Sequence, residues 1–217
     1  MTFADFHHQL QTKHPDRLRV MHQSRSLSLP ERFQLMCLAV QDENPRIRYD
    51  AVSQLGTVGT VDLERTRQIL ETVLQSDPEV DVRAAAADSL GVLQITSAFP
   101  LLVHAYRSSR DWLLQLSIVA ALGTLGVREA FPVLVEATTS ENELVQISAI
   151  RALGDLGDER AVEVVAQFRT HADWQVRHAV VQALSHLGEK AKPLLQELIQ
   201  DPVSHIAEAA RLGLGSD

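Results

Sequence analysis

LQLSIVAALGTLG, residues 114–126, recurs in related form along most of the chain. The other copies are IRYDAVSQLGTVG at 47–59, VRAAAADSLGVLQ at 82–94, VQISAIRALGDLG at 145–157, VRHAVVQALSHLG at 176–188 and a shorter IAEAARLGLG at 206–215. The leucine near the end of each copy falls at positions 55, 90, 122, 153, 184 and 214, a spacing of 30 to 35 residues. A period of this length predicts a stack of similar structural units.

Each unit is expected to be a pair of helices. The stretches before the copies, such as LPERFQLMCLAVQ (29–41) and AFPVLVEATTS (130–140), also place apolar residues at helical spacing. A helix pair cannot bury both apolar faces alone, so neighbouring pairs must stack. The sequence therefore predicts an all-α fold, a right-handed α-solenoid of about six helix pairs. We expect one domain over residues 1–217, with an N-terminal helical cap at 1–27 and repeats at 28–217.

Glycine and aspartate mark the expected helix ends. Gly123 and Gly126 are expected to end the second helix of their repeat, because glycine adopts the left-handed conformation easily. Asp77 and Asp201 each precede a proline, which predicts an N-cap followed by proline at the first helical position. Ser140 with Glu143 fits a capping box.

Composition excludes several classes of partner. The formal net charge of −8 opposes the long-range attraction of a polyanion, so nucleic acid is not expected as a partner. No apolar run reaches the roughly 18 residues of a membrane span, and the N-terminus lacks the pattern of a secretory signal. We therefore expect a cytoplasmic protein without a membrane partner.

The repeats resemble a known family. The spacing of Asp42 with Arg48 and of Asp77 with Arg83, together with the Leu-Gly-x-Leu-Gly ending, resembles HEAT repeats. Within that family, DWLLQLSIVAALGTLGVREAFPVLVEAT (111–138) and NELVQISAIRALGDLGDERAVEVVAQF (142–168) resemble the HEAT-like units of E/F-type phycobilin lyases, in particular cyanobacterial homologues implicated in phycobilisome degradation. Glutamines at 115 and 146 stand where the HEAT pattern has arginine, so a complete Asp–Arg ladder is not expected.

The resemblance implies a phycobilisome-directed accessory factor. Such a factor binds a phycobiliprotein or its open-chain bilin and promotes chromophore detachment and antenna disassembly, a lyase-like activity. It implies phycocyanobilin as a transient ligand, no permanent cofactor and no catalytic residue that can be transferred. The alternative is a non-enzymatic adaptor that binds another protein through the concave face. Both hypotheses stand, because a chromophore groove and a peptide groove both need apolar residues with a few arginines. A homodimer is compatible with either.

A helical wheel selects the candidate binding face. Positions one before, two after and six after the first residue of each copy point away from the core when each residue turns by about 100°. Contiguous exposed apolar surface with a polar rim is typical of an interaction site. The opposing interpretation is that the central second helices are buried on more sides than a wheel allows. The candidate residues are Leu113, Leu116, Leu144 and Ile147, with Tyr49, Arg151 and His178 at the edges.

Two tryptophans occupy the same position of their repeats. Trp112 and Trp174 each follow an aspartate, at 111 and 173, near the start of a second helix. In the functional interpretation they form an aromatic wall for a tetrapyrrole, the aspartates accept pyrrole N–H bonds, and Arg151 or Arg177 binds the propionates. In the structural interpretation the aspartate is the N-cap and the tryptophan packs on the adjoining first helix.

The remaining candidates favour structural roles. Histidines at 7, 8 and 14, and the pair at 171 and 178, match no specific metal-ligand pattern, so no metal site is expected. Cys37 lies in an apolar run and is expected to be a core residue. An exchange of its thiol with a bilin thioether would need exposure and a lowered pKa. The regularly spaced arginines at 48, 83 and 177 are expected to donate hydrogen bonds between repeats rather than form an anion site.

Overall fold

The computed structural model describes residues 2–12 and 17–215 of the chain. Within these ranges every regular element is a helix, which confirms the all-α prediction. Two compact units, Met1–Ser117 and Ile118–Asp217, divide the chain inside one helix, and each unit is described by itself.

The first unit contains α1 (Phe3–Gln11), α2 (Arg17–Gln23), α3 (Leu29–Ala39), α4 (Pro45–Val58), α5 (Leu63–Ser76), α6 (Val80–Val92), α7 (Phe99–Ser108) and the start of α8 (Trp112–Leu125). The second unit contains the rest of α8, then α9 (Phe131–Ala137), α10 (Glu143–Leu156), α11 (Ala161–Ala166), α12 (Trp174–Ser185), α13 (Lys192–Leu198) and α14 (Ser204–Leu214).

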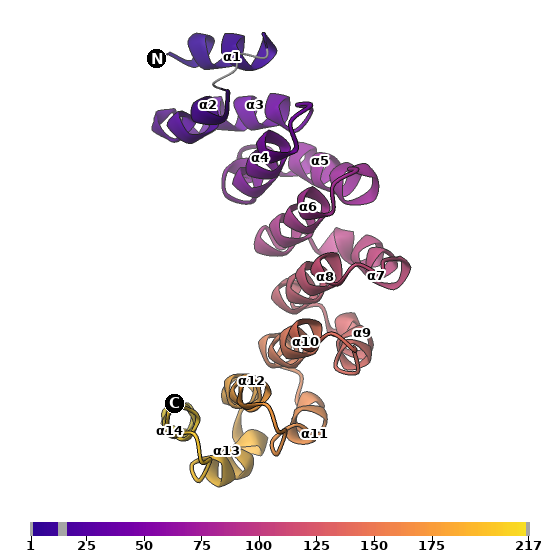
Figure 1. Ribbon diagram of the computed structural model, residues 1–217, viewed down its shortest axis with the longest axis vertical. Coiled ribbons are helices and arrows are strands. Elements are labelled where there is room, and N and C mark those ends of the chain that lie inside the picture. Colours follow the sequence, from indigo (N-terminus) through magenta and orange to yellow (C-terminus); the bar gives the residue numbers. More distant parts are fainter. Residues whose placement is uncertain (1, 13–16, 216–217) are drawn as a thin grey trace. The chain divides into compact units, whose positions relative to one another are not determined.

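Within each unit, first helices pack on second helices and neighbouring second helices lie side by side (Figure 1). In the first unit α3 packs on α4, α5 on α6, and α4 on α6. In the second unit α9 packs on α10, α11 on α12, α13 on α14, and α12 lies between α10 and α14. This succession of helix pairs is that of an α-solenoid. The segment expected as a cap contains α1 and α2, and α1 packs on α2 and α3 through Phe6 and Leu10.

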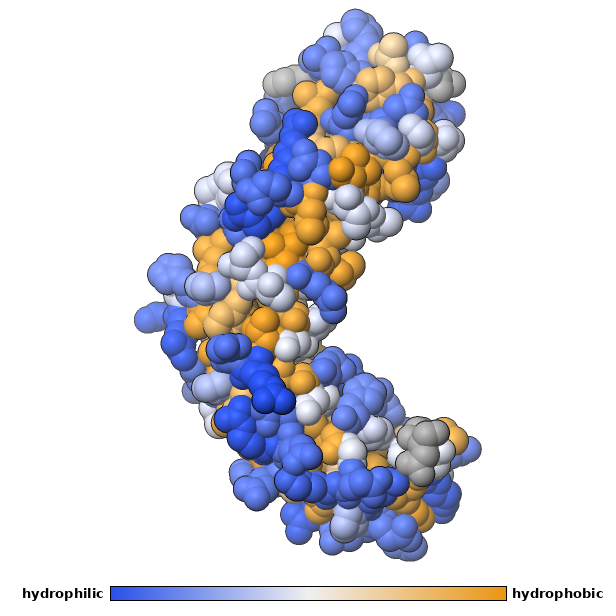
Figure 2. Space-filling view, turned by 180° about the vertical axis from the view of Figure 1, so that it is seen from behind, coloured by the Kyte–Doolittle hydropathy of each residue, from blue (hydrophilic) through white to orange (hydrophobic). Residues whose placement is uncertain are grey.

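The core follows the repeat. The first residue of every copy is buried, as is the leucine near the end of the first five copies. Figure 2 shows the resulting surface, where hydrophilic side chains cover much of each unit and apolar ones appear between them. No helix in the described ranges has both the length and the apolar character needed to cross a bilayer.

The two glycines of the repeat have different roles. Gly154 lies inside α10, and a β-carbon there would stand 2.5 Å from the Cα atom of Ala183 on α12. Gly123 meets Ala152 in the same way. The expectation that this first glycine ends the helix is therefore wrong, because it serves close helix packing instead. The second glycine does end the helix: Gly157 has a φ angle of +66° at the C-cap of α10. In the repeat of α6 a glutamine, Gln94, adopts the same left-handed conformation with φ +50°.

The predicted starts of the second helices also need correction. Helix α6 begins after Glu79 and α14 after Val203, so neither Asp77 nor Asp201 is the N-cap. Each aspartate instead accepts a hydrogen bond from the backbone N–H two residues later, at 3.0 Å from Glu79 and 2.8 Å from Val203. This turn leaves the rest of the carboxylate available for an arginine.

Before α10, the N-cap is Asn142, whose side chain accepts hydrogen bonds from the N–H groups of Leu144 and Val145. The capping box expected from Ser140 and Glu143 is therefore wrong. Ser140 stands two residues before this N-cap, and its hydroxyl accepts a hydrogen bond from the N–H of Asn142.

Two arginines link consecutive repeats, as expected. Arg48 binds the carboxylate of Asp77 at 2.8 Å, and Arg177 binds that of Asp201 at 2.7 Å. Each also donates to backbone carbonyls of its own repeat, those of Asp42 and His171 respectively. We call each such arginine–aspartate pair a charged rung.

Other repeats have neutral bonds at the same position. Gln146 donates to the carbonyl of Thr138 at 2.9 Å, and Gln115 to that of Ser109 at 2.9 Å. Arg83 donates to the carbonyl of Leu74, within its own helix pair, so the expectation of an inter-repeat bond is wrong for this residue. The next repeat has serine at 109, where Asp77 and Asp201 stand in theirs. The ladder is incomplete because Arg83 lacks an aspartate in the next repeat, whereas Gln115 and Gln146 replace the arginine itself.

Candidate functional site

The candidate binding residues divide between the two units. Tyr49, Trp112, Leu113 and Leu116 belong to the first unit, and Leu144, Ile147, Arg151, Trp174 and His178 belong to the second. In each unit the side chains six positions after the start of a copy are exposed, as the wheel predicts. Leu144 and Tyr49 are also exposed, each to 48%.

Ile147 departs from the helical-wheel prediction. Its side chain is buried, with only 7% of the residue exposed, so the expectation that it faces water is wrong. Ile147 lies seven residues before Gly154, which places both residues on the same side of α10. Since Gly154 packs against Ala183, this side of α10 faces α12. A second helix between neighbours is buried on more sides than an isolated amphipathic helix. In the first unit, Leu113 and Leu116 are half-buried, which also falls short of the predicted exposure.

Both aspartates before the tryptophans are helix caps. Asp111 accepts a hydrogen bond from the N–H of Leu113 at 2.9 Å, and Asp173 accepts one from that of Gln175 at 2.8 Å. These carboxylates are therefore engaged by backbone groups at the starts of α8 and α12. Both tryptophans remain 45% exposed.

Trp174 belongs to a cluster of rings that joins α12 and α14. Its indole meets the imidazole of His205 edge to face, with 4.9 Å between ring centroids. His205 also meets His178, at 5.8 Å. Trp174 thus packs on the next second helix, whereas the structural interpretation placed it on a first helix. His205 stands one position before the start of its copy, the position that Leu113 and Leu144 occupy in theirs.

A hollow of about 440 Å³ lies over α10, α12 and α14, wholly within the second unit. Arg151 and Asp155 line it from α10, and His178 and Gln182 line it from α12. His186 follows at the end of α12, and α14 contributes a mostly apolar wall that includes Leu212. This volume is within the range of sites for small ligands.

The charges of the hollow are unevenly distributed. Burial, the charge of Arg151 and the nearby His205 lower the pKa of His178, so its imidazole is mostly neutral at pH 7. His186 stands 3.3 Å from the carboxylate of Asp155. Since Arg151 and Asp155 are one helical turn apart, the hollow has a cationic part near Arg151 and His178 and a second part where His186 contacts the carboxylate of Asp155.

Several lining residues were not selected as site candidates from the sequence. Gln182 and Leu212 occupy the same outward position as Arg151 but have no distinctive chemistry by themselves. Asp155 and His186 lie four residues beyond that position, close to it on the helix surface. Extending the wheel by one turn would have identified both. The contact of His205 with Trp174 depends on how α12 and α14 are rotated, which no sequence pattern specifies.

Among the described residues, no group of three or more histidine, cysteine, aspartate or glutamate side chains could hold a metal ion. His14 lies outside the described residues. The imidazole of His171 accepts a hydrogen bond from the N–H of Asp173 at 3.1 Å, which gives it a role in the turn before α12.

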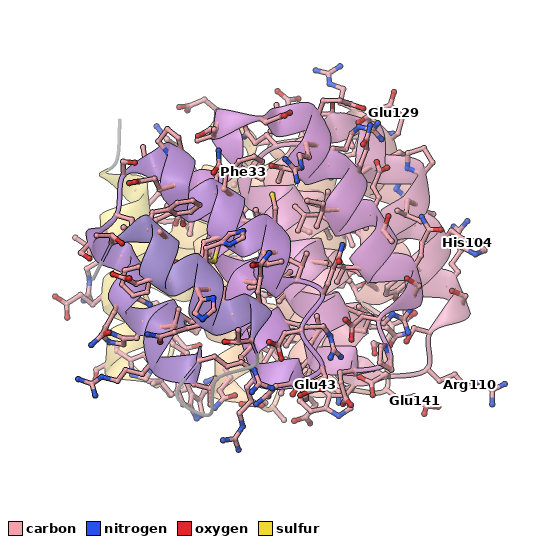
Figure 3. All side chains as sticks on the ribbon, turned by 90° about the horizontal axis from the view of Figure 1, so that it is seen from above. Phe33, Glu43, His104, Arg110, Glu129 and Glu141 are labelled. Carbon is pink, nitrogen blue, oxygen red and sulfur yellow. The ribbon has the colours of Figure 1, made fainter. Side chains whose placement is uncertain are left out.

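Figure 3 shows His104 of α7 and Arg110 of the following turn pointing outward, and both are exposed.

Cys37 is a core residue, as predicted. It is only 8% exposed, and burial raises the pKa of its thiol, contrary to the needs of thiol exchange. It lies at the edge of a second hollow, of about 650 Å³, between α3 and α5 in the first unit. The arginine of that hollow nearest the repeat turn, Arg48, is already bound to Asp77.

Comparison with known families finds two matches. The family described as HEAT repeats matches residues 27–91 and 99–171, which is more than half of the chain. The family described as PBS lyase HEAT-like repeat matches residues 176–201. That second segment contains nearly all of α12 and all of α13, with both members of the Arg177–Asp201 rung.

Several solved structures are similar in fold. The complex of CpcE and CpcF of phycocyanin lyase from Nostoc sp. PCC7120 is 22% identical, with a TM-score of 0.66 over 85% of this chain and 76% of that one. An archaeal HEAT-like repeat protein from Thermococcus onnurineus NA1 is 14% identical, with a TM-score of 0.61 over 99% and 96%. An engineered protein is 20% identical, with a TM-score of 0.62 over 84% and 95%. No curated protein matches the chain.

Proposed function

The chain belongs to the HEAT-repeat proteins, and from this we propose that it is a phycobilisome-directed accessory factor that binds a phycobiliprotein or its bilin. Its finer role would be to promote chromophore detachment and antenna disassembly, as in the lyase homologues implicated in phycobilisome degradation. The observation that carries the proposal is the PBS lyase HEAT-like match at residues 176–201. The same segment contributes His178 and Gln182 to the hollow of the second unit.

The chemistry of the second unit suits a bilin. An open-chain tetrapyrrole is planar, conjugated and apolar over most of its surface, and it carries propionate carboxylates. The half-exposed Trp174 offers an aromatic face at one end of α12, and Arg151 offers a cation in the hollow. Exposed Leu144 adds apolar surface on α10. These residues, with His178, form the binding surface that we propose.

Detachment needs no dedicated catalytic residue if the chain binds the released bilin. Cleavage of the thioether yields a cysteine thiol on the phycobiliprotein and a free bilin. A protein that binds the free bilin shifts this equilibrium by mass action. We therefore assign the chain a stoichiometric role in bilin capture and name no catalytic residue.

Incubation with holo-phycocyanin tests the proposal. We expect the visible absorbance of the bound bilin to fall in proportion to the amount of chain added, and bilin to appear in the chain's fraction after gel filtration. Holo-phycocyanin without the chain is the control. An unchanged spectrum together with a stable complex would instead support the non-enzymatic adaptor.

A matched pair of variants locates the surface. Trp112 and Trp174 are equally exposed but lie in different units. We expect Trp174→Ala to reduce the change in absorbance and Trp112→Ala to leave most of it. The opposite pattern would move the binding surface to the first unit, and circular dichroism would check that both variants fold.

A further inference from the structure

We propose that the hollow of the second unit is a carboxylate site, in which Arg151 and His178 together hold one carboxylate of a planar small molecule. The identity of that molecule as a bilin, bound through a propionate, rests on the proposed function. The carboxylate chemistry rests on the geometry of α10, α12 and α14.

Arg151 differs from the other arginines near the site. Arg177, the alternative that the sequence leaves open, is bound to Asp201 and only 11% of its side chain is exposed. Arg160 pairs with Asp158, and Arg169 with Glu197. Arg151 makes no hydrogen bond or ion pair with any residue that the structure describes. Its guanidinium is therefore the cation of this hollow that is available for a bidentate contact with a carboxylate.

His178 faces the same space from the neighbouring helix. The close approach of Gly154 to Ala183 brings α10 and α12 together, so that both residues line one hollow. Burial and then the positive charge of Arg151 lower the pKa of His178, and His205 acts in the same direction. A bound carboxylate would reverse this effect, because an opposite charge favours the imidazolium form.

The same hollow disfavours polyanions. Asp155 lies one turn after Arg151 and contributes a negative charge to the lining, where its carboxylate contacts His186. A phosphate group or a nucleic-acid backbone would bring further negative charge close to this carboxylate. A single carboxylate can occupy the cationic part and leave Asp155 with its histidine. The net charge of −8 acts against a polyanion over the whole surface.

The surroundings favour a flat, partly apolar ligand. Trp174 lies one turn before His178 on α12, and its ring pair with His205 continues the surface beyond the hollow. Ala209 and Leu212 of α14 form an apolar side of the hollow. A conjugated ring system with an attached carboxylate would contact the cationic part, the aromatic rings and the apolar side of the hollow. A simple aliphatic acid would contact only the cationic part.

The test is a titration with free phycocyanobilin and with its dimethyl ester. Trp174 serves as the fluorescent reporter in a Trp112→Phe background, because a bound bilin quenches a nearby indole by energy transfer. We expect the diacid to bind at least about tenfold more tightly than the ester, as the loss of one charge-assisted contact implies. Equal affinities would overturn the carboxylate assignment.

Three variants sharpen this test. Arg151→Gln is expected to weaken diacid binding about tenfold and to leave ester binding unchanged, whereas Arg151→Lys restores part of the affinity. The matched control is Arg211→Gln, which removes the same charge from an exposed position of α14 outside the hollow and should have no effect. If Arg151→Gln folds and binds the diacid as tightly as the unmodified chain, the assignment is wrong.

The outcomes separate this inference from the proposed function. Arg151-dependent binding of the free bilin without any effect on holo-phycocyanin would retain the carboxylate site and reject detachment. If the loss of phycocyanin absorbance persists in Arg151→Gln, and acid and ester bind equally, the carboxylate site is rejected and detachment is retained. A glutamate-rich peptide is added as a competitor. Arg151-dependent binding of the peptide without binding of the bilin would overturn the small-molecule assignment.

Discussion

The junction between α10 and α12 and the junction between α12 and α14 solve one packing problem in two ways. At the first junction the residue in the arginine's place, Gln146, bonds instead to the Thr138 carbonyl of its own helix pair, and Gly154 lies against Ala183. At the second, Arg177 forms a charged rung with Asp201. There the glycine lies on the later helix, α14, because Gly213 packs against Ser185 of α12. Both junctions thus contain one very small residue, on α10 in the first and on α14 in the second, and the charged rung accompanies the second.

Removal of the rung arginine is expected to have the largest effect. Arg177→Ala leaves the carboxylate of Asp201, whose side chain is only 3% exposed, without its counter-charge. We expect a loss of about 3–5 kcal/mol in the unfolding free energy of the second unit. Gln146→Ala removes one neutral hydrogen bond and should cost about 1 kcal/mol. Urea unfolding followed by Trp174 fluorescence in a Trp112→Phe background measures both, and equal losses would contradict the distinction between the charged rung and the neutral bond.

Acid should weaken the charged junction selectively. The hydrogen bond from Arg177 lowers the pKa of Asp201 below its ordinary value, with burial acting against this effect. A carboxyl group with a lowered folded-state pKa contributes its stability above about pH 4, near its unfolded value, and loses it as the pH falls through the folded-state value.

The measurement compares Asp201→Asn with the unmodified chain at pH 7 and pH 3. The difference in unfolding free energy should shrink at pH 3, because most of this carboxyl group is then protonated in the unfolded chain. The corresponding difference for Gln146→Ala should stay constant, because neither partner titrates. A difference for Asp201→Asn that does not change with pH would show that the rung contributes nothing through its charge.

Exchange of the small residue tests the packing half of the comparison. Gly154→Ser places a side chain against Ala183 and should cost about 1–3 kcal/mol through overpacking. The double variant Gly154→Ser with Ala183→Gly reproduces the arrangement of Ser185 and Gly213. We expect it to be more stable than Gly154→Ser alone, even though glycine inside α12 costs up to about 1 kcal/mol. A double variant that is less stable than the single one would show that the junctions are not equivalent.

Much of the fold could be predicted from the sequence because the repeat is expressed in residue types. The buried positions and the outward position of Arg151 follow from helical periodicity alone. The first glycine was assigned wrongly because a glycine near a helix end is compatible with both a C-cap and a close helix contact. Only the neighbouring helix distinguishes the two, and for Gly154 that neighbour lies about one repeat further along the chain.

The site was less predictable for the same reason. A helical wheel treats each helix as having one packed side, whereas Ile147 is covered by an adjacent second helix. The hollow depends on side chains from three repeats. The neighbouring His205 becomes significant only through its contacts with Trp174 and His178. Sequence reasoning found Arg151, Trp174 and His178 individually. It could not show that Arg177 is already bound and Arg151 is not.

The Arg177–Asp201 rung also bears on how such a chain can lengthen. Stability in a stacked protein comes from each repeat and its nearest neighbours, so copying a segment preserves it only when every new neighbour is compatible. A copied segment that separates residue 177 from residue 201 would place a buried carboxylate beside a repeat that offers it glutamine. A segment that includes both residue 177 and residue 201 keeps the ion pair intact. The segment that can be duplicated without loss of this ion pair is therefore not one helix pair. It begins in one second helix and ends in the turn before the next second helix.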